Sequence, residues 1–363
     1  MIVAQQDQRP RVWQWRLALQ NAWLHRGLWY WLSQPLAALY GVVTWIRQWL
    51  YQQRVCKTCV LPVPVIVVGN LVAGGAGKTP TVMAVVETLR RYGYRPGVVS
   101  RGYGRNSCEV QEVFLGSAVQ WTGDEPLLIK RRLGDEVPVF VGSKRVQAAR
   151  ALLARYAQID CLVCDDGLQH WALGRDVTVL VIDERGWGNG ALLPSGPLRQ
   201  RPPNATPAAT MVVYNPLCVT TALPGTLAVS RLAALIPLEQ WSPAWQPAQP
   251  IVETLEQLRQ RGAVQGEWYA AAGMARPERF FGLLERHGLN LQRLPLRDHF
   301  NFAHCPWPLT AQGVVVTEKD AIKLQQQPWV AQRATQIWVA RLGFELSAEC
   351  QAQLLKLMHK DKT

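Results

Sequence analysis

A glycine-rich run between an apolar strand and a helix constrains this chain more than any other feature. Residues 69–79 read Gly-Asn-Leu-Val-Ala-Gly-Gly-Ala-Gly-Lys-Thr, after a strand-like run at 63–68 and before apolar residues at helical spacing at 82–89. The unpaired N–H groups in the first turn of a helix attract a phosphate, and glycines let the preceding backbone curve around it. The run therefore predicts a phosphate-binding loop (P-loop) within an α/β fold.

The residue types in this loop match what a nucleoside triphosphate requires. Lys78 would neutralise the β- and γ-phosphates, and the hydroxyl of Thr79 would ligate Mg²⁺. The predicted cofactors are ATP and Mg²⁺, and the predicted ATP-contacting residues are Gly74, Gly75, Ala76, Gly77, Lys78, Thr79 and Pro80. The strict consensus has another glycine where this chain has Val72, so the match is to the shorter pattern GGxGKT.

A second motif supplies the carboxylates that a P-loop needs for its metal. Residues 161–166 read Cys-Leu-Val-Cys-Asp-Asp, an apolar strand that ends in two acids. Asp165 and Asp166 are therefore predicted to ligate Mg²⁺ together with Thr79. Cys161 and Cys164 lie three apart on this strand and should point to opposite faces, which favours structural thiols over half of a zinc site.

Short β-branched runs alternate with amphipathic stretches along most of the chain, which is typical of βαβ units. Further strands are expected at residues 97–100, 137–141, 159–164, 177–182, 211–214, 268–272, 314–317 and 337–340. The predicted fold is α/β, with a P-loop NTPase-like, mainly parallel sheet domain, a second, smaller α/β domain and an N-terminal membrane-associated helix. We place the N-terminal segment at 1–57, the P-loop domain at 58–235 and the domain that closes the active-site cleft at 236–363.

The N-terminal segment differs in composition from the rest. Residues 1–57 carry seven Lys or Arg, one acid and seven Trp. Residues 28–46 are uncharged but contain Ser33, Gln34 and Pro35, and their many Trp and Tyr suit the headgroup region better than the hydrocarbon centre of a bilayer. We therefore expect a helix that lies in the membrane interface; a single spanning anchor, or a helix packed only against protein, are the alternatives.

The overall charge is strongly basic. The chain has 39 Lys and Arg against 26 Asp and Glu, a net charge of +13, which favours anionic partners. The N-terminal basic residues lie beside apolar aromatic sequence and no nucleic-acid-binding motif is present, so nucleic acid is not an expected partner. Eight Cys in 363 residues are too dilute for a disulfide framework and indicate reduced, cytosolic thiols.

Further motifs follow one another along the chain. They are Ser-Arg-Gly-Tyr at 100–103, Gly-Asp-Glu-Pro at 123–126, Asp-Asp-Gly-Leu-Gln-His at 165–170, Leu-Pro-Ser-Gly-Pro-Leu-Arg at 193–199, Asp-His at 298–299 and Val-Thr-Glu-Lys-Asp-Ala-Ile-Lys at 316–323. Together they resemble the tetraacyldisaccharide 4'-kinase family of lipid A biosynthesis over nearly the whole chain. The resemblance implies transfer of the γ-phosphate of ATP to the 4'-hydroxyl of a tetraacylated glucosamine disaccharide 1-phosphate, giving lipid IVA, at the cytoplasmic face of the bacterial inner membrane.

The same resemblance implies roles for individual residues. Asp124 would accept the proton of the attacking hydroxyl, His299 would orient it from the other domain, and Lys78 would complete the catalytic set. Glu125 would support the metal or this dyad. The predicted substrate-binding residues are Arg101, Arg145, Gln169, His170 and Arg199. By residue type alone, Asp124 could instead cap the helix that follows it, and Asp-His could be a surface turn.

Two departures from the family pattern and two alternative functions remain. The family commonly has Phe where Leu168 stands and Glu where Gln200 stands, which puts any carboxylate role at the latter position in doubt. Another P-loop small-molecule kinase or a membrane-associated, nucleotide-dependent switch would also explain the P-loop. The predicted partners are the acylated disaccharide and the anionic lipid of the inner membrane, and the sequence does not indicate protein partners.

Overall fold

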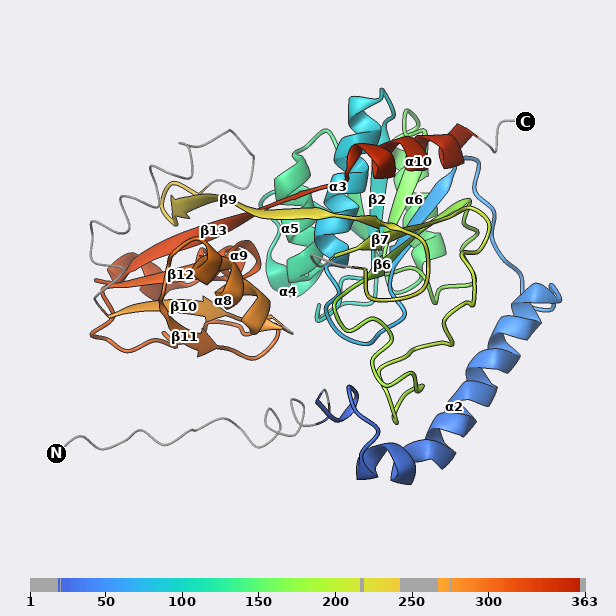
Figure 1. The fold of residues 1–363 in the computed structure, drawn as a ribbon. Coiled ribbons are helices and arrows are strands. Elements are labelled where there is room, and N and C mark those ends of the chain that lie inside the picture. Colours follow the sequence, from blue (N-terminus) through green and yellow to red (C-terminus); the bar gives the residue numbers. More distant parts are fainter. Residues whose placement is uncertain (1–18, 20, 216–218, 242–266, 275, 360–363) are drawn as a thin grey trace.

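The computed structural model describes residues 19, 21–215, 219–241, 267–274 and 276–359. It has two sheets side by side and a long helix that extends away from the first of them (Figure 1). Residues 1–18 and 242–266 lie outside the described residues, and so do the predictions that fall on them.

The first sheet has eight strands in the order β3-β4-β2-β5-β1-β6-β7-β8. All neighbours in it are parallel except β3 and β4. Its strands are β1 Val65–Gly69, β2 Pro96–Ser100, β3 Gln111–Val113, β4 Val139–Val141, β5 Cys161–Asp165, β6 Val177–Ile182, β7 Thr210–Tyr214 and β8 Thr226–Leu227. The central strands read as unbroken apolar runs because both faces of a parallel sheet are covered.

Helices cover both faces of this sheet. They are α3 Lys78–Arg91, α4 Val119–Thr122, α5 Asp124–Leu133 and α6 Arg145–Arg155. Side chains of α3 and α5 share one core with Cys161, whereas those of α6 share the opposite core with Cys164. The two cysteines of β5 thus lie on opposite faces, as their spacing predicts, and cannot ligate one ion together.

The second sheet has five strands in the order β11-β10-β12-β13-β9. Its neighbours are parallel except β9, which is antiparallel to β13. The elements of this part are β9 Val229–Pro237, β10 Trp268–Ala272, α8 Pro277–Arg286, β11 Gln292–Pro295, β12 Gly313–Thr317, α9 Glu318–Leu324, the 3-10 helix η1 Pro328–Gln332, β13 Gln336–Glu345 and α10 Ala348–His359. The predicted α/β class, with a mainly parallel first sheet and a second α/β unit, is confirmed.

The junction between the sheets differs from the predicted boundary. The chain leaves the first sheet after β8 and begins β9 at Val229, so the position predicted from the sequence, between residues 235 and 236, lies inside a strand of the second sheet. After β13 the chain returns to the first sheet, where α10 packs beside β7. The pairing of β9 with β13 joins segments about a hundred residues apart, and no local pattern in the sequence reveals such a pairing.

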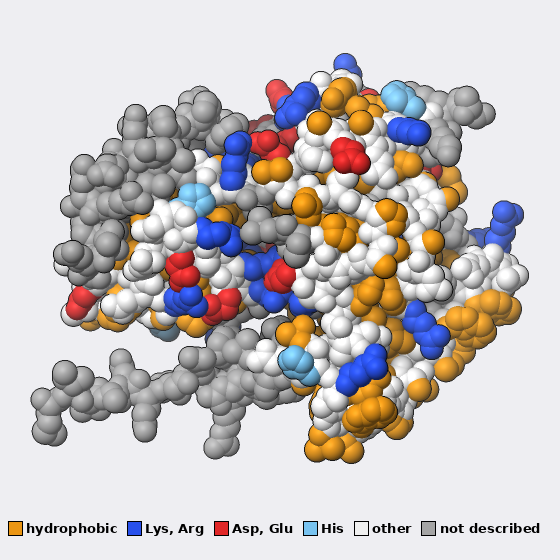
Figure 2. Space-filling view, viewed as in Figure 1, with side chains coloured by type: hydrophobic (Ala, Val, Ile, Leu, Met, Phe, Trp, Pro, Cys, Tyr) orange, Lys and Arg blue, Asp and Glu red, His pale blue; other side chains and the backbone are white. Residues whose placement is uncertain are grey.

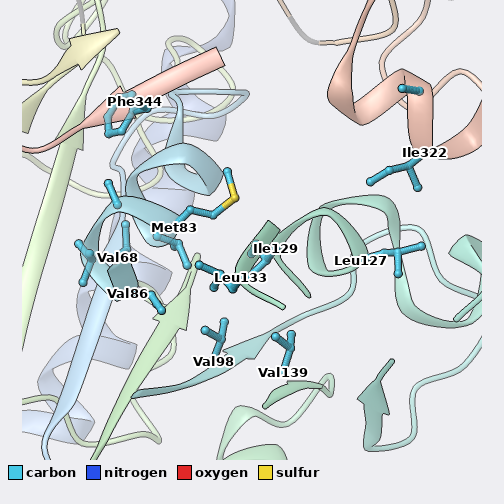
Figure 3. Packing of buried hydrophobic residues seen from close by; sticks show 14 of the residues in the cluster. Val68, Met83, Val86, Val98, Leu127, Ile129, Leu133, Val139, Ile322 and Phe344 are labelled. Atoms are coloured by element: carbon cyan, nitrogen blue, oxygen red, sulfur yellow. The ribbon is translucent and has the colours of Figure 1, made fainter. Parts of the chain in front are cut away.

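One hydrophobic core continues across both sheets. Figure 3 shows Met83 of α3 and Ile129 of α5 close to one another, with Phe344 of β13 and Ile322 of α9 in the same cluster. All four side chains are buried. The two units are therefore held together by shared apolar packing as well as by polar contacts.

Helix α2, Leu28–Gln52, runs through Pro35 without a break. It is attached to the loop at residues 187–199 by hydrogen bonds. The indole N–H groups of Trp23, just before the helix, and Trp29 donate to the carbonyl of Pro194 at 2.9 and 3.0 Å. Farther along, the hydroxyl of Tyr40 donates to the carbonyl of Arg199 at 2.9 Å. The helix thus runs along the loop that ends in the predicted substrate residue Arg199.

Most large apolar side chains of α2 are exposed. Figure 2 shows them gathered at the end of the molecule where α2 lies. They are Leu28, Trp29, Trp31, Leu32, Leu36, Leu39, Val42, Val43, Trp45, Ile46 and Trp49. No helix in the described part of the chain is both long and apolar enough to cross a membrane.

Candidate active site

The phosphate loop lies between β1 and α3, at the edge of the first sheet where its parallel strands end. Gly77 has φ +82° and directly precedes α3, whose first three residues are Lys78, Thr79 and Pro80. A Cβ on Gly77 would lie 1.7 Å from the side-chain nitrogen of Asn215. That nitrogen donates to the carbonyl of Ala76 at 3.1 Å. Only glycine fits here, because the backbone is left-handed and the next loop approaches too closely.

The rest of the loop is held from its other side. Gly74 has φ +98°, and the nearest neighbour to a Cβ there would be the guanidinium of Arg185. This guanidinium donates to the carbonyl of Ala73 at 2.8 Å and pairs with the buried carboxylate of Asp183. Gly75 is exposed, whereas Ala76 is buried. The backbone of the loop is therefore fixed before any ligand binds.

Lys78 is held by two oxygens in this structure. Its ammonium donates to the side-chain oxygen of Asn70 at 3.1 Å and lies 3.5 Å from the carboxylate of Asp166. Arg199 donates to the same carboxylate at 3.0 Å. Burial alone would raise the pKa of Asp166, but Lys78, Arg199 and Arg145 outweigh it and hold the pKa below its ordinary value. Asp166 is thus an ionised partner for these cations.

Asp165, the last residue of β5, has a different environment. One carboxylate oxygen accepts a hydrogen bond from the hydroxyl of Ser100 at 3.0 Å. The other oxygen is buried and has no hydrogen-bond partner among the described residues. Burial, followed by the nearby carboxylates of Glu125 and Asp166, raises the pKa of Asp165 to about 7. A cation beside the free oxygen would relieve this repulsion, so the site fits a divalent metal.

The four predicted metal ligands are not equivalent. Thr79 is in the first turn of α3, and Asp166 is already paired with two cations. Glu125 lies 3.4 Å from the ammonium of Lys319. Within the described residues, no three His, Cys, Asp or Glu side chains are grouped closely enough to hold a metal alone. Mg²⁺ commonly needs only one or two carboxylates, since waters and nucleotide phosphates complete its shell.

The two sheets meet at Asp124 and His299. Asp124 is the first residue of α5, and His299 lies in the loop after β11 with φ +59°. The Nδ1 atom of His299 is 2.8 Å from Oδ2 of Asp124. The ring of Tyr103 lies 5.4 Å from that of His299, centre to centre. The structure thus brings together three predicted motifs that are far apart in the sequence.

Two lysines that the sequence analysis did not select complete this cluster. Lys319 and Lys323 of α9 place their ammonium groups 3.7 and 3.5 Å from Oδ2 of Asp124. Burial alone would raise the pKa of Asp124, but the hydrogen bond with His299 and the two ammonium groups lower it well below its ordinary value. The spacing of the two lysines in the motif at 316–323 could have indicated this, because lysines four apart on a helix share one face.

The predicted substrate residues lie around the end of β5. Arg145 is buried at the start of α6 and donates to the carbonyl of Asp166 at 3.1 Å, while its Nε lacks a partner among the described residues. Gln169 donates to the carbonyl of Asn70 at 3.2 Å. Arg101 is exposed in the loop after β2. This set joins the phosphate loop to the segment after β5.

His170 lies in a region of positive charge that lowers its pKa. Burial, followed by the charges of Arg145, Arg47 and Arg101, lowers the pKa of His170 to about 4. Its Nε2 atom is buried and has no partner in the part of the chain described here. A neutral imidazole beside several guanidinium groups is suited to an anionic ligand. Arg47 belongs to α2, so this helix contributes to the same field.

A P-loop at the carboxyl edge of a mainly parallel sheet places the chain in the class of P-loop nucleotide-binding proteins. The family model for tetraacyldisaccharide-1-P 4'-kinase matches residues 29–359. The chain belongs to this family, and this membership confirms the predicted lipid A kinase activity. The tetraacyldisaccharide 4'-kinase of Leptothrix cholodnii is 47% identical over 93% of this chain and 94% of its own.

Two further comparisons agree with this family assignment. The tetraacyldisaccharide 4'-kinase of Methylibium petroleiphilum is 46% identical, over 90% of this chain and 89% of its own. The crystal structure of the Aquifex aeolicus family member in complex with ATP is similar, with a TM-score of 0.69 and 25% identity, over 91% of this chain and 99% of that one.

Proposed function

We propose that this chain transfers the γ-phosphate of ATP to the 4'-hydroxyl of a tetraacyldisaccharide 1-phosphate where its two sheet units meet. The observation that carries the proposal is the contact between Asp124 and His299, 2.8 Å long, at the start of a helix next to the phosphate loop. A nucleotide switch needs no carboxylate and imidazole of this kind. The family membership gives the acceptor, and the Aquifex relative gives ATP as the nucleotide.

The phosphate loop would hold ATP by its backbone and by Lys78. Lys78 and Arg199 now share the carboxylate of Asp166 and would turn to phosphate oxygens when the nucleotide binds. Phosphoryl transfer has a loose transition state, so these cations act mainly by positioning the γ-phosphate and stabilising its charge. Gly74 to Pro80 would supply the remaining contacts.

Mg²⁺ would be held by Asp165 and Thr79, with Asp166 or Glu125 farther out. The free, buried oxygen of Asp165 supports this order, because among the carboxylate oxygens of Asp165, Asp166 and Glu125 it alone is buried without a hydrogen-bond partner in the described chain. Bound Mg²⁺ supplies charge stabilisation at the β- and γ-phosphates. This assignment separates the roles of the two adjacent aspartates.

Asp124 would take the proton of the 4'-hydroxyl as the new O–P bond forms and the bond from the γ-phosphorus to ADP breaks. Its low pKa makes it a weak base, which suits a reaction in which the hydroxyl becomes acidic only late, after bonding to phosphorus has begun. His299 would hold the carboxylate in place from the second sheet. The proton would then pass from Asp124 to solvent.

The group formed by the cationic Arg101 and Arg145 and the neutral His170 would receive the substrate's own phosphate. Two of these residues have buried nitrogens without partners in the described chain, Nε of Arg145 and Nε2 of His170. Gln169 and Arg199 link the group to the phosphate loop. The enzyme would thus recognise the acceptor by a charged end, away from its acyl chains.

The acyl chains would remain in a membrane on which α2 rests. A helix with exposed Trp and Leu side chains and an arginine near its end is suited to the lipid interface. We place the protein at the cytoplasmic face of the inner membrane, where ATP is available, with α2 as a peripheral anchor. The anionic lipid surface is then its second partner.

The test is transfer of labelled γ-phosphate from MgATP to purified tetraacyldisaccharide 1-phosphate in detergent micelles. Wild type should form product, and Asp124→Asn and His299→Ala should each lower kcat, the former by roughly 10²- to 10⁴-fold. Glu136→Gln, at an exposed ion pair with Arg90, is the matched control and should retain activity. Full activity in both dyad variants would refute the proposed roles, and ATP binding without lipid product in wild type would favour a nucleotide switch.

A further inference from the structure

Residues 193–199 pair with the first part of the phosphate loop. Two backbone hydrogen bonds of 2.7 Å connect residues 71–73 with residues 197–199 in antiparallel fashion. In one of them the N–H of Arg199 donates to the carbonyl of Leu71. Paired backbones hold one another at a fixed spacing, so the position of the start of the loop depends on that of the 193–199 segment.

Helix α2 holds the same segment by hydrogen bonds of its own. The hydroxyl groups of Ser33 and Ser195, both buried, are hydrogen-bonded at 2.8 Å. Farther along α2, the hydroxyl of Tyr40 donates to the carbonyl of Arg199 at 2.9 Å. These bonds add to the two indole contacts with the carbonyl of Pro194. The 193–199 segment therefore joins α2 to the phosphate loop.

Arg199 is the residue where these connections meet. Its backbone N–H is bonded to the phosphate loop, and its carbonyl is bonded to Tyr40. Its guanidinium donates to the carboxylate of Asp166 at 3.0 Å and to the side-chain oxygen of Gln169 at 3.4 Å. The hydrogen bond from Tyr40 thus fixes the backbone from which the Arg199 side chain reaches the nucleotide site.

The rest of α2 makes little buried contact with the protein. Its buried residues are Ser33 and Ala37, and Figure 1 shows the helix extending away from both sheets. The contacts with the 193–199 segment must therefore offset most of the entropy lost when α2 takes one orientation. A lipid surface bound to the exposed apolar side chains restricts that orientation beforehand, which lowers the entropy cost of the remaining contacts.

We propose that Tyr40 is a positioning residue that couples the lipid contact of α2 to the nucleotide site. With α2 on a lipid surface, the bond from Tyr40 to Arg199 forms more completely, and the 193–199 segment holds the start of the phosphate loop in the arrangement that binds MgATP. The inference rests on the proposed function, since it takes α2 as the lipid-binding helix and the loop as the ATP site. It adds that the enzyme binds MgATP more tightly on a membrane than away from it.

The contact that carries the coupling sets its size. A single hydrogen bond of this kind changes an equilibrium constant about 2- to 10-fold. Lipid should therefore strengthen MgATP binding by about that factor. Thermodynamic reciprocity requires MgATP to strengthen lipid binding by the same factor.

The first experiment measures the affinity for MgATP by isothermal titration, with and without vesicles of phosphatidylethanolamine and phosphatidylglycerol. In wild type the vesicles should strengthen MgATP binding about 2- to 10-fold. Tyr40→Phe keeps the ring and removes the hydroxyl, so its MgATP affinity should be weak and equal under both conditions. The absence of a vesicle effect in wild type, or an equal effect in Tyr40→Phe, would overturn the proposal.

Tyr51→Phe is the matched control. Tyr51 belongs to the same helix, but its hydroxyl makes no hydrogen bond within the described residues. This variant makes the same chemical change to α2 and should keep the wild-type effect of vesicles on MgATP affinity. A loss of that effect as large as in Tyr40→Phe would assign it to the helix in general and would count against the role of Tyr40.

The second experiment measures the reverse effect by vesicle sedimentation with and without MgATP. MgATP should strengthen vesicle binding of wild type by the factor found in the first experiment, and should leave that of Tyr40→Phe unchanged. If Tyr40 had a structural role only, its loss would weaken MgATP binding equally with and without vesicles, and that result would overturn the inference. If wild type bound no MgATP or no vesicles, the proposed function would fail first; binding of both without mutual strengthening would refute this inference alone.

Discussion

Replacing Gly77 by alanine should destabilise the phosphate loop, and the structure allows the free-energy cost to be estimated. A left-handed backbone costs a non-glycine residue about 1–2 kcal/mol, and Gly77 has φ +82°. The new methyl group would also displace the side chain of Asn215, whose hydrogen bond to Ala76 contributes about 1 kcal/mol. The binding-competent loop should therefore be destabilised by roughly 2–3 kcal/mol, which corresponds to MgATP affinity weakened roughly 30- to 150-fold.

Isothermal titration with MgATP measures this loss directly. Gly93→Ala is the matched control, since Gly93 has φ +86° but no atom within 4 Å of its Cβ position. It should lower stability by about 1–2 kcal/mol through backbone strain alone and leave ATP affinity unchanged. The double variant Gly77→Ala with Asn215→Ala should recover the part of the loss due to the collision. Wild-type affinity in Gly77→Ala would refute the assigned role of the close approach.

Three further predictions follow from other parts of the molecule. Because burial and the neighbouring Glu125 and Asp166 raise the pKa of Asp165 to about 7, the ligand-free protein should lose stability as the pH rises from about 4 to 7; Asp165→Asn should raise Tm at about pH 8 but not at about pH 4. Trp45→Glu should weaken binding to anionic vesicles, measured by vesicle sedimentation, about 10-fold or more, since one buried apolar side chain contributes about 1.5–3 kcal/mol. The same change at Leu309, which is exposed in the second unit, should have no effect on sedimentation with the vesicles. Phe344→Ala should destabilise by about 3–5 kcal/mol and lower a single melting transition; two separated transitions in wild-type calorimetry would contradict a shared core.

Local patterns predicted most strands of the first sheet and the phosphate loop. The strands at 177–182 and 268–272 were predicted with the bounds that the structure has, because each is a short apolar run between polar turns. The predicted strand at 337–340 is longer in the structure, where β13 continues through Arg341. A charged residue normally ends a buried strand, but Arg341 is buried and lies 3.9 Å from Glu318.

The parts that sequence could not supply depend on contacts between distant segments. No feature of the sequence of β9 indicates that it pairs with β13. The contact between Asp124 and His299 was predicted from family resemblance and not from residue spacing. Lys319 was within a quoted motif but had no predicted role, since its partners come from α5 and the loop after β11. The roles assigned to these residues stay predictions until the variants are measured.

The way Asp166 holds both Lys78 and Arg199 has a consequence for how ligands enter. Without nucleotide, the positive charges of the phosphate loop are already partly compensated, so a free anion gains little by approaching them alone. MgATP offers a metal cation near the carboxylates and phosphates for the two basic groups in one event. Thermodynamic linkage then requires that metal and nucleotide each strengthen the binding of the other by the same factor. Inorganic phosphate and metal-free ATP should therefore be poor competitors for this site.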